Sequence, residues 1–408
     1  MADAARKTAF EAASRVIGGA YSNLLSFDKL EKRIDRAFAE SIFLTTLERR
    51  ITLTHIAGKY IKKETKSELF TLILTGLCQI IYMNKVPDSA ACDETTEIAR
   101  EVFGYDASRF VNAVLRSACR DREIIEKEIE NGEEYIKYSV GKELFALIRE
   151  QYPDNYKEIF EAFFGKSRCF LRVNTLKAKA EEVAKTVGGS VVNEKTVVCD
   201  AADAVNHLGS SRFYIQGYGS QEASSALGAK KGETVIDVCA CPGGKSLSAA
   251  INMGNEGKIY SFDIHENKLS LIEKSAKKLG ISIITAEKHD GKSAKSELIG
   301  KADRVICDVP CSGTGEIGSK PEIRNKKPED FERLYETQRA IAVSSAKYLK
   351  IGGTMVYSTC SINKKENEEA VEVLLSSDET LVSAEERTIL PSFEIPEGFY
   401  YNVIKRIK

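Results

Sequence analysis

Five short runs rich in β-branched residues alternate with amphipathic helical stretches in the second half of the chain. The runs are Thr234–Ala240, Lys258–Ile264, Ser282–Asp290, Arg304–Pro310 and Thr354–Cys360. Strands that alternate with helices at this spacing predict a doubly wound, mostly parallel α/β sheet. Ligands bind beyond the carboxyl ends of the strands in such sheets, so we expect the functional residues at that edge.

The first part of the chain, residues 1–125, contains only helical patterns, which predict an all-helical bundle. The segment Ser67–Met83 is apolar nearly all round, as expected of a central helix. Two further helices are expected at Cys92–Phe103 and Ser108–Arg122, the second with Ser108 as its N-cap. A bundle without clustered reactive side chains indicates a binding module.

Residues 126–215 are expected to form a linker and a small α/β subdomain, and residues 216–408 the third domain. The mixed charges of Asp121–Ser139 indicate a surface connector with some helix. A strand is expected at Cys169–Val173.

Composition places the chain among globular proteins, because 43% of its residues are hydrophobic and 29% are charged. A length of 408 residues favours two or three domains. No apolar run is long enough to span a membrane, and the N-terminus lacks a secretory signal, so we expect a cytoplasmic protein. With a net charge of −1, an RNA partner would need a local basic face.

A glycine turn follows the first expected strand, within Asp237–Lys245. Gly243 and Gly244 allow a ligand close to the backbone, and the next helix offers free N–H groups to an anion. The turn is neither a Walker loop nor a GxGxxG dinucleotide motif, which argues against a dehydrogenase. Many nucleotide-like sites share such a glycine pair.

The next two expected strands end in aspartates, Asp263 and Asp290. A carboxylate at the end of the second strand is well placed to accept hydrogen bonds from ribose hydroxyls, and one on the third could meet an adenine amine. An isolated aspartate at a strand end is more often a turn residue. Three successive strand ends with suitable groups favour an adenosyl-bearing cofactor, whose carboxylate Lys245 would contact.

The fourth and fifth strands each end in a turn with one cysteine, Cys311 and Cys360. We expect these strands to be neighbours, with both thiols facing one cleft. The ten cysteines are too sparse for a disulfide scaffold, and Cys78 and Cys119 lie in apolar helical patterns typical of buried residues. The spacings of Cys239, Cys241, Cys307 and Cys311 do not match paired zinc ligands, so no metal is expected.

Three of these segments resemble the signature motifs of the NOL/NOP/Sun family of RNA cytosine-5 methyltransferases. They are Asp237–Lys245, Asp308–Arg324 and Tyr357–Glu368, and the resemblance extends to Leu171–Lys177 and Gly398–Lys408. Val86–Ala99 and Arg109–Ala118 resemble a NusB-like RNA-binding domain. The resemblance implies a Rossmann-like class I methyltransferase domain that uses S-adenosylmethionine, and a target cytosine in 16S ribosomal RNA.

The same resemblance implies the roles of individual residues. Cys360 would be the thiolate that adds to carbon 6 of the base, Asp308 would stabilise the adduct, and Cys311 would assist release. The implied cofactor-binding residues are Cys239, Ala240, Cys241, Pro242, Gly243, Gly244, Lys245, Asp263, Asp290 and Asp308. The target base must leave its stack, which indicates single-stranded or loop RNA. We expect a monomer.

Two other interpretations stay open. A methyltransferase acting on DNA cytosine would place its nucleophile in the Pro-Cys turn, at Cys311. A non-catalytic RNA-binding assembly factor would rely on the helical domain alone. The chain also departs from the family pattern at Cys241, at Gln216-Gly217 and at Gly318–Lys320, the last of which puts RNA contacts of that loop in doubt.

Overall fold

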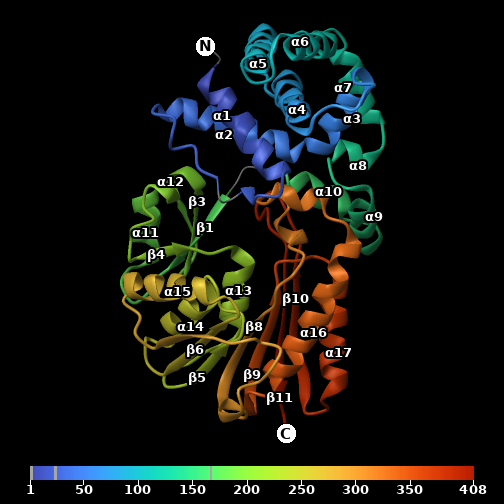
Figure 1. The fold of residues 1–408 in the computed structure, drawn as a ribbon. Helices are drawn as coiled ribbons and strands as arrows, with labels where there is room; N and C mark the ends of the chain where they lie inside the picture. The colour runs from blue at the N-terminus through green and yellow to red at the C-terminus, as the bar shows by residue number, and fades with distance from the viewer. Residues whose placement is uncertain (1–2, 23–24, 166–167) are drawn as a thin grey trace. The chain divides into compact units, whose positions relative to one another are not determined.

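Residues 3–22, 25–165 and 168–408 are described by the computed structural model, and they divide between two units (Figure 1). Unit 1 comprises Met1–Leu147 and Lys320–Lys327, and unit 2 comprises Ile148–Ser319 and Pro328–Lys408. The expected domains at residues 1–125, 126–215 and 216–408 stay a prediction. In the described part of the chain, no helix is both long and apolar enough to cross a membrane.

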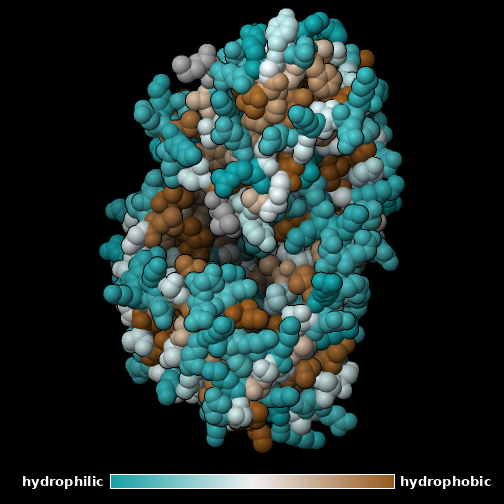
Figure 2. Space-filling model, in the orientation of Figure 1, coloured by the Kyte–Doolittle hydropathy of each residue, from teal (hydrophilic) through white to brown (hydrophobic). Residues whose placement is uncertain are grey.

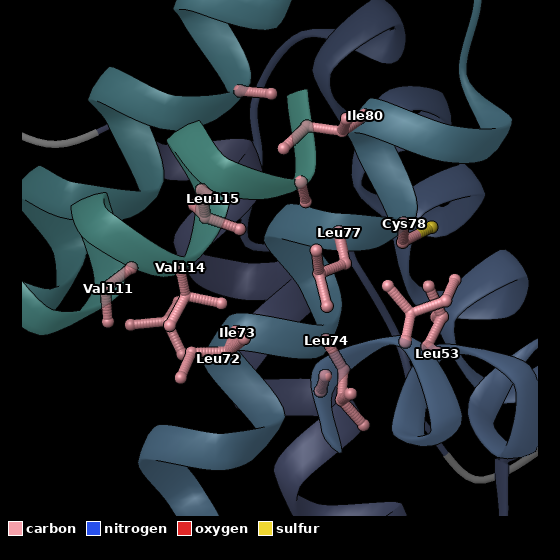
Figure 3. Close-up of a cluster of buried hydrophobic side chains, with 14 of the residues drawn as sticks. Leu53, Leu72, Ile73, Leu74, Leu77, Cys78, Ile80, Val111, Val114 and Leu115 are labelled. Atoms are coloured by element: carbon pink, nitrogen blue, oxygen red, sulfur yellow. The ribbon is translucent and has the colours of Figure 1, made fainter. Parts of the chain in front are cut away.

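Unit 1 is helical, as the apolar periodicity predicts. Its helices are α1 (Ala4–Ile17), α2 (Arg33–Glu48), α3 (Arg50–Tyr60), α4 (Ser67–Tyr82), α5 (Asp88–Phe103), α6 (Tyr105–Arg120), α7 (Arg122–Asn131), α8 (Glu134–Lys137) and the first part of α9 (Lys142–Gln151). Every residue of α4 from Thr71 to Ile81 is buried, so α4 is the expected central helix (Figure 3). Gly76 allows α6 to approach it closely, because a Cβ atom there would lie 2.8 Å from Leu115 Cδ1.

The expected start of α6 was wrong. Helix α6 begins at Tyr105, and Ser108 is not its cap but donates a hydrogen bond to the Tyr105 carbonyl at 2.7 Å. Gly104, with φ of 90°, separates α5 from α6 in a backbone conformation that glycine adopts at low steric cost. The stretch Asp121–Ser139 forms α7 and α8 with most of its charged side chains exposed, so the expected exposed segment with some helix is confirmed.

A short segment from late in the sequence completes unit 1. Residues Lys320–Lys327 contain the 3₁₀ helix η4 (Pro321–Asn325), whose Arg324 is fully buried. Arg324 Nη1 donates to the Tyr138 carbonyl at 2.9 Å, and the Gly141 N–H donates to the Arg324 carbonyl at 2.7 Å. Burial lowers the pKa of the Arg324 guanidinium to about 9.

Unit 2 contains a seven-stranded sheet in the order β10-β11-β9-β8-β5-β6-β7. Its strands are β5 (Thr234–Asp237), β6 (Lys258–Asp263), β7 (Ile284–Lys288), β8 (Ala302–Asp308), β9 (Leu349–Thr359), β10 (Leu381–Ile389) and β11 (Phe399–Arg406). Neighbouring strands pair in parallel from β7 through β6, β5 and β8 to β9. Strand β11 is antiparallel to both of its neighbours, β9 and β10. The expected mostly parallel sheet is confirmed, and β10 is an edge strand that the sequence did not reveal.

Helices cover both faces of this sheet (Figure 1). One face packs against α13 (Tyr218–Ala226), α14 (Gly244–Asn252) and α15 (Glu266–Leu279), and the other against α16 (Glu332–Ala346) and α17 (Glu368–Ser377). Successive residues alternate between the two cores, as Val235 and Ile236 do on β5. In Figure 2 the visible surface over α16 and α17 is mainly hydrophilic, as expected of amphipathic helices.

A four-stranded antiparallel sheet precedes the large one in unit 2, in the order β2-β3-β1-β4. Its elements are β1 (Arg168–Val173), α11 (Ala180–Val187), β2 (Ser190–Asn193), β3 (Thr196–Asp200), α12 (Ala201–Val205) and β4 (Phe213–Ile215), after α10 (Tyr156–Ala162). Asn174 follows β1 and is fully buried. Its Nδ2 donates to the carbonyls of Ser211 and Leu279, each at 3.0 Å, which joins the small sheet to α15.

We expect Asn174→Ala to lower the free energy of unfolding by about 1–3 kcal/mol, because a buried and a partly buried carbonyl lose their donor. Urea denaturation followed by circular dichroism would measure the change. The exposed Asn206→Ala is the matched control and should leave the midpoint within error. Equal midpoints for the two variants would contradict the bridging role of Asn174.

Candidate active site

Three neighbouring parallel strands, β5, β8 and β9, end at the same edge of the large sheet. In their registers Asp237 lies opposite Ile306, and Asp308 lies opposite Ser358. The turns that follow these strands therefore lie side by side. This confirms the expectation that the two cysteine-bearing strands are neighbours.

The glycine turn after β5 is held by backbone hydrogen bonds. The Ala240 N–H donates to the Phe262 carbonyl at 2.7 Å, and the Gly243 N–H donates to the Ala240 carbonyl at 2.6 Å. Gly243 has φ of 108°, a conformation that favours glycine, and α14 starts at the next residue. The turn thus presents the N-terminus of a helix at the edge where ligands bind in such folds.

Asp263 ends β6 and Asp290 follows β7, the next two strands of the sheet beyond β5. The Asp263 carboxylate accepts from the Cys241 N–H at 3.2 Å and from the His265 N–H at 2.9 Å, so it also shapes the glycine turn. Asp290 is exposed and accepts from the Lys292 N–H at 3.0 Å. Its neighbour Gly291 approaches β5 closely, since a Cβ there would lie 3.3 Å from the Val238 carbonyl.

Lys245 and Asp308 form an ion pair between the glycine turn and the turn after β8. Lys245 Nζ lies 2.7 Å from Asp308 Oδ2, and the Lys245 side chain is only 10% exposed. The ammonium also lies 5.1 Å from the centre of the Phe399 ring. The other carboxylate oxygen of Asp308 accepts from Ser358 Oγ at 2.7 Å. Asp308 is therefore fixed from two sides.

The thiols of Cys311 and Cys360 lie beside this pair, with their Sγ atoms 3.1 Å apart. Both residues are partly exposed and both are free thiols. The pKa of Cys360 is raised well above its ordinary range by the hydrogen bond with Cys311, by burial and by the nearby Glu316 carboxylate. The free protein therefore holds Cys360 as a neutral thiol.

Comparison with known proteins assigns this arrangement to a family. Residues 224–402 match the model of the 16S rRNA methyltransferase RsmB/F family, and residues 3–120 match the NusB family. A probable ribosomal RNA small subunit methyltransferase B from Bacillus subtilis is 34% identical over 380 residues, which cover 87% of this chain and 84% of the relative. The chain belongs to the RsmB/F methyltransferase family. A ribosomal RNA small subunit methyltransferase B from Vibrio vulnificus is 30% identical, with 91% of each chain covered.

Solved structures agree with this fold. The crystal structure of PH0851 superposes with a TM-score of 0.83 at 22% identity and covers 98% of each chain. NSun6 from Pyrococcus horikoshii, in a structure with SFG, gives a TM-score of 0.58 at 18% identity over 66% of this chain and 98% of that one. Unit 1 thus carries the NusB helical fold, and unit 2 the mostly parallel Rossmann-like fold of S-adenosylmethionine-dependent methyltransferases.

The strand-end residues of this RsmB/F chain fit S-adenosylmethionine. The nearest neighbour of a Cβ atom on Gly244 would be Gln216 Nε2, at 3.6 Å, so the helix start is not tightly covered there. The adjacent Asp263 and Asp290 supply carboxylates for hydroxyl and amine groups, and Lys245 supplies a cation. That these residues contact the cofactor, as expected from the sequence, stays a prediction.

The departure from the family pattern at Gly217 has a structural explanation in this chain. A Cβ atom on Gly217 would lie 2.4 Å from Glu397 Oε2, and the Gly219 N–H donates to Glu397 Oε1 at 2.9 Å. Burial raises the pKa of this Glu397 carboxyl. A carboxylate from the loop before β11 thus accepts from the first turn of α13.

Sequence reasoning missed several residues that build the site. Ser358 and Phe399 contact the Lys245–Asp308 pair, and Glu366 accepts hydrogen bonds from both cysteine turns. Glu366 falls within a motif that resembles the family, but no spacing rule connects an acidic residue six positions after a cysteine with that cysteine. Only its contacts reveal its place.

Alkylation of Cys360 by iodoacetamide should be slow at pH 8 and rise through pH 10, since the thiolate is the reactive form. Cys311→Ala removes the first cause of the raised pKa of Cys360. The pKa then falls, and the rate at pH 8 increases by about tenfold for each unit. Peptide mass spectrometry would measure the rates. Cys241 is the internal reference, because its pKa of about 12 arises from burial and from Asp263. A rate that stays constant or falls in the variant would contradict the assignment.

Proposed function

We propose that this protein methylates carbon 5 of a cytosine in 16S ribosomal RNA, with Cys360 as the covalent nucleophile and Cys311 assisting release. The observation that carries the proposal is the 3.1 Å separation of the two thiols at the ends of neighbouring strands, beside the Lys245–Asp308 pair. Family membership supplies the reaction class. The cytosine and the cysteine roles are the proposal.

Two thiols suit this reaction because carbon 5 of cytosine is a poor nucleophile. When the Cys360 sulfur bonds to carbon 6, the double bond between carbons 5 and 6 opens and carbon 5 becomes electron-rich. The Cys360 proton leaves to Glu316, whose carboxylate lies within hydrogen-bonding reach of the thiol. This accounts for a nucleophile that is neutral in the free protein.

The Lys245–Asp308 pair faces the charge that develops on the ring. We assign to it the proton that the ring nitrogen takes up as the adduct forms, with Ser358 holding Asp308 in place. Bound S-adenosylmethionine supplies an electrophilic methyl group on its sulfonium for the activated carbon 5. Gly243, Gly244 and the carboxylates of Asp263 and Asp290 would hold it.

Release requires a second base. After methylation carbon 5 still carries its proton, and that proton must leave before the bond between Cys360 and carbon 6 can break. Cys311 would accept it as a thiolate, after its own proton has left to solvent, because its sulfur is adjacent to that of Cys360. The C5–H electrons then restore the ring double bond and expel the Cys360 thiolate. Forming the adduct does not require Cys311.

The RNA substrate follows from the family and from the geometry of a base in a duplex. The names of the relatives from Bacillus subtilis and Vibrio vulnificus specify ribosomal RNA of the small subunit. A stacked base cannot reach a sulfur at the end of a strand, so the target cytosine would be unpaired or flipped out. The NusB-like unit 1 would bind RNA, with the protein acting as a monomer.

Cys360→Ala should abolish methyl transfer from tritiated S-adenosylmethionine to unmodified 16S ribosomal RNA. Cys311→Ala should retain adduct formation but trap the RNA as a covalent complex that survives denaturing electrophoresis, because release is blocked. Incorporation of tritium and the shifted protein band would be measured on the same samples.

The matched control is Cys119→Ala, which removes a partly exposed thiol of unit 1 and should transfer methyl groups at the wild-type rate. Methylation by Cys360→Ala would refute the proposed nucleophile. Loss of the adduct in Cys311→Ala, with retention in Cys360→Ala, would instead identify Cys311 as the nucleophile.

A further inference from the structure

Glu366 is a fully buried carboxylate that belongs to neither the cofactor turn nor the proposed catalytic residues. It ends the 3₁₀ helix η6 (Lys364–Glu366), which follows the Cys360 turn. We infer that Glu366 is a positioning residue that fixes Cys311 and Cys360 relative to each other. This inference rests on the proposed function of the two cysteines and adds a residue that acts through them.

The contacts of Glu366 reach both cysteine turns at the residue immediately after each cysteine. Its Oε1 accepts from the Ser312 N–H at 2.7 Å, and its Oε2 accepts from Ser312 Oγ at 2.5 Å. The same Oε2 accepts from Ser361 Oγ at 2.5 Å. One side chain therefore links the turn that follows β8 with the turn that follows β9.

Additional hydrogen bonds make this link rigid. Gln338 Nε2 donates to Glu366 Oε1 at 2.9 Å, so both oxygens accept two hydrogen bonds. Glu366 itself is held by Tyr357 Oη, which donates to its carbonyl at 2.6 Å. Thr314 Oγ1 lies 2.8 Å from Ser361 Oγ and adds a second connection between the turns.

A carboxylate matches this set of donors, because each of its two oxygens accepts two hydrogen bonds. A glutamine of the same shape would place its own N–H groups against a serine hydroxyl or an amide N–H. At least one buried donor would then lose its acceptor, and the two turns would separate. The chemistry needs them together, because the two thiols act on adjacent carbons of one base.

The experiment uses the distance between the thiols as its readout, in the full-length protein without RNA. Diamide oxidises two adjacent thiols to a disulfide, and its N=N bond takes up the two hydrogens that the thiols lose. We would measure closure of the Cys311–Cys360 disulfide by peptide mass spectrometry in wild-type protein and Glu366→Gln. The Cys92–Cys119 pair, with sulfurs 3.5 Å apart in unit 1, is the internal reference.

Glu366→Gln should slow Cys311–Cys360 closure by about tenfold or more, while Cys92–Cys119 closure stays constant. In the methylation assay kcat should fall by about a hundredfold, with the KM for S-adenosylmethionine unchanged within about twofold. Glu366→Asp retains the charge and should recover part of both rates. Glu372→Gln, an exposed change on α17, is the matched control and should behave as wild type.

If Glu366→Gln forms the Cys311–Cys360 disulfide at the wild-type rate and has the wild-type kcat, the inference is overturned. If Glu366→Gln does not fold, Ser361→Ala removes the hydrogen bond to the Cys360 turn, and Ser312→Ala removes one of the two hydrogen bonds to the Cys311 turn. The rate of Cys311–Cys360 disulfide closure is measured in these two variants in the same way. Unchanged closure in both serine variants would also overturn it. Methylation by Cys360→Ala would refute the proposed function, whereas the disulfide rate tests Glu366 without reference to activity.

Discussion

The parallel register of β5, β8 and β9 is the constraint on which the site depends. It places the ends of three strands at one edge, so side chains far apart in sequence meet without long loops. Lys245, at the start of α14, contacts Asp308 at the end of β8, and Cys311 contacts Cys360 across the turns that follow β8 and β9. A shift of one residue would turn each side chain toward the opposite face. The two hydrophobic cores on the faces of the sheet oppose such a shift.

Burial determines how the polar groups at this edge are used. Charged groups removed from water are costly unless they are paired or hydrogen-bonded. Lys245 and Asp308 neutralise each other, whereas Glu366 accepts hydrogen bonds from hydroxyl, side-chain amide and backbone donors. The same burial favours the neutral form of the Cys360 thiol. The site is therefore held rigid by hydrogen bonds, and activation of its thiol depends on a neighbouring acceptor.

The elements that could be predicted from the sequence are those that a pattern within a short stretch of residues determines. The strands of the parallel sheet and the apolar helix α4 have periodicities that appear within a short window. The start of α6 was missed because it depends on Gly104 rather than on the serine that follows. Strand β10 was missed because its residues between Leu381 and Ile389 are mostly exposed, so it lacks the alternation that marks a half-buried strand.

The sequence by itself determined the fold class, the order of the strand-end turns and the residue types available for chemistry at Cys311, Cys360 and Asp308. Tertiary structure decided which distant groups meet. It brought Glu366 into hydrogen-bonding contact with both cysteine turns and placed residues 320–327 in unit 1. The physical reason is that periodicity and turn residues act over a few positions, whereas hydrogen bonds between buried groups depend on packing across the whole unit.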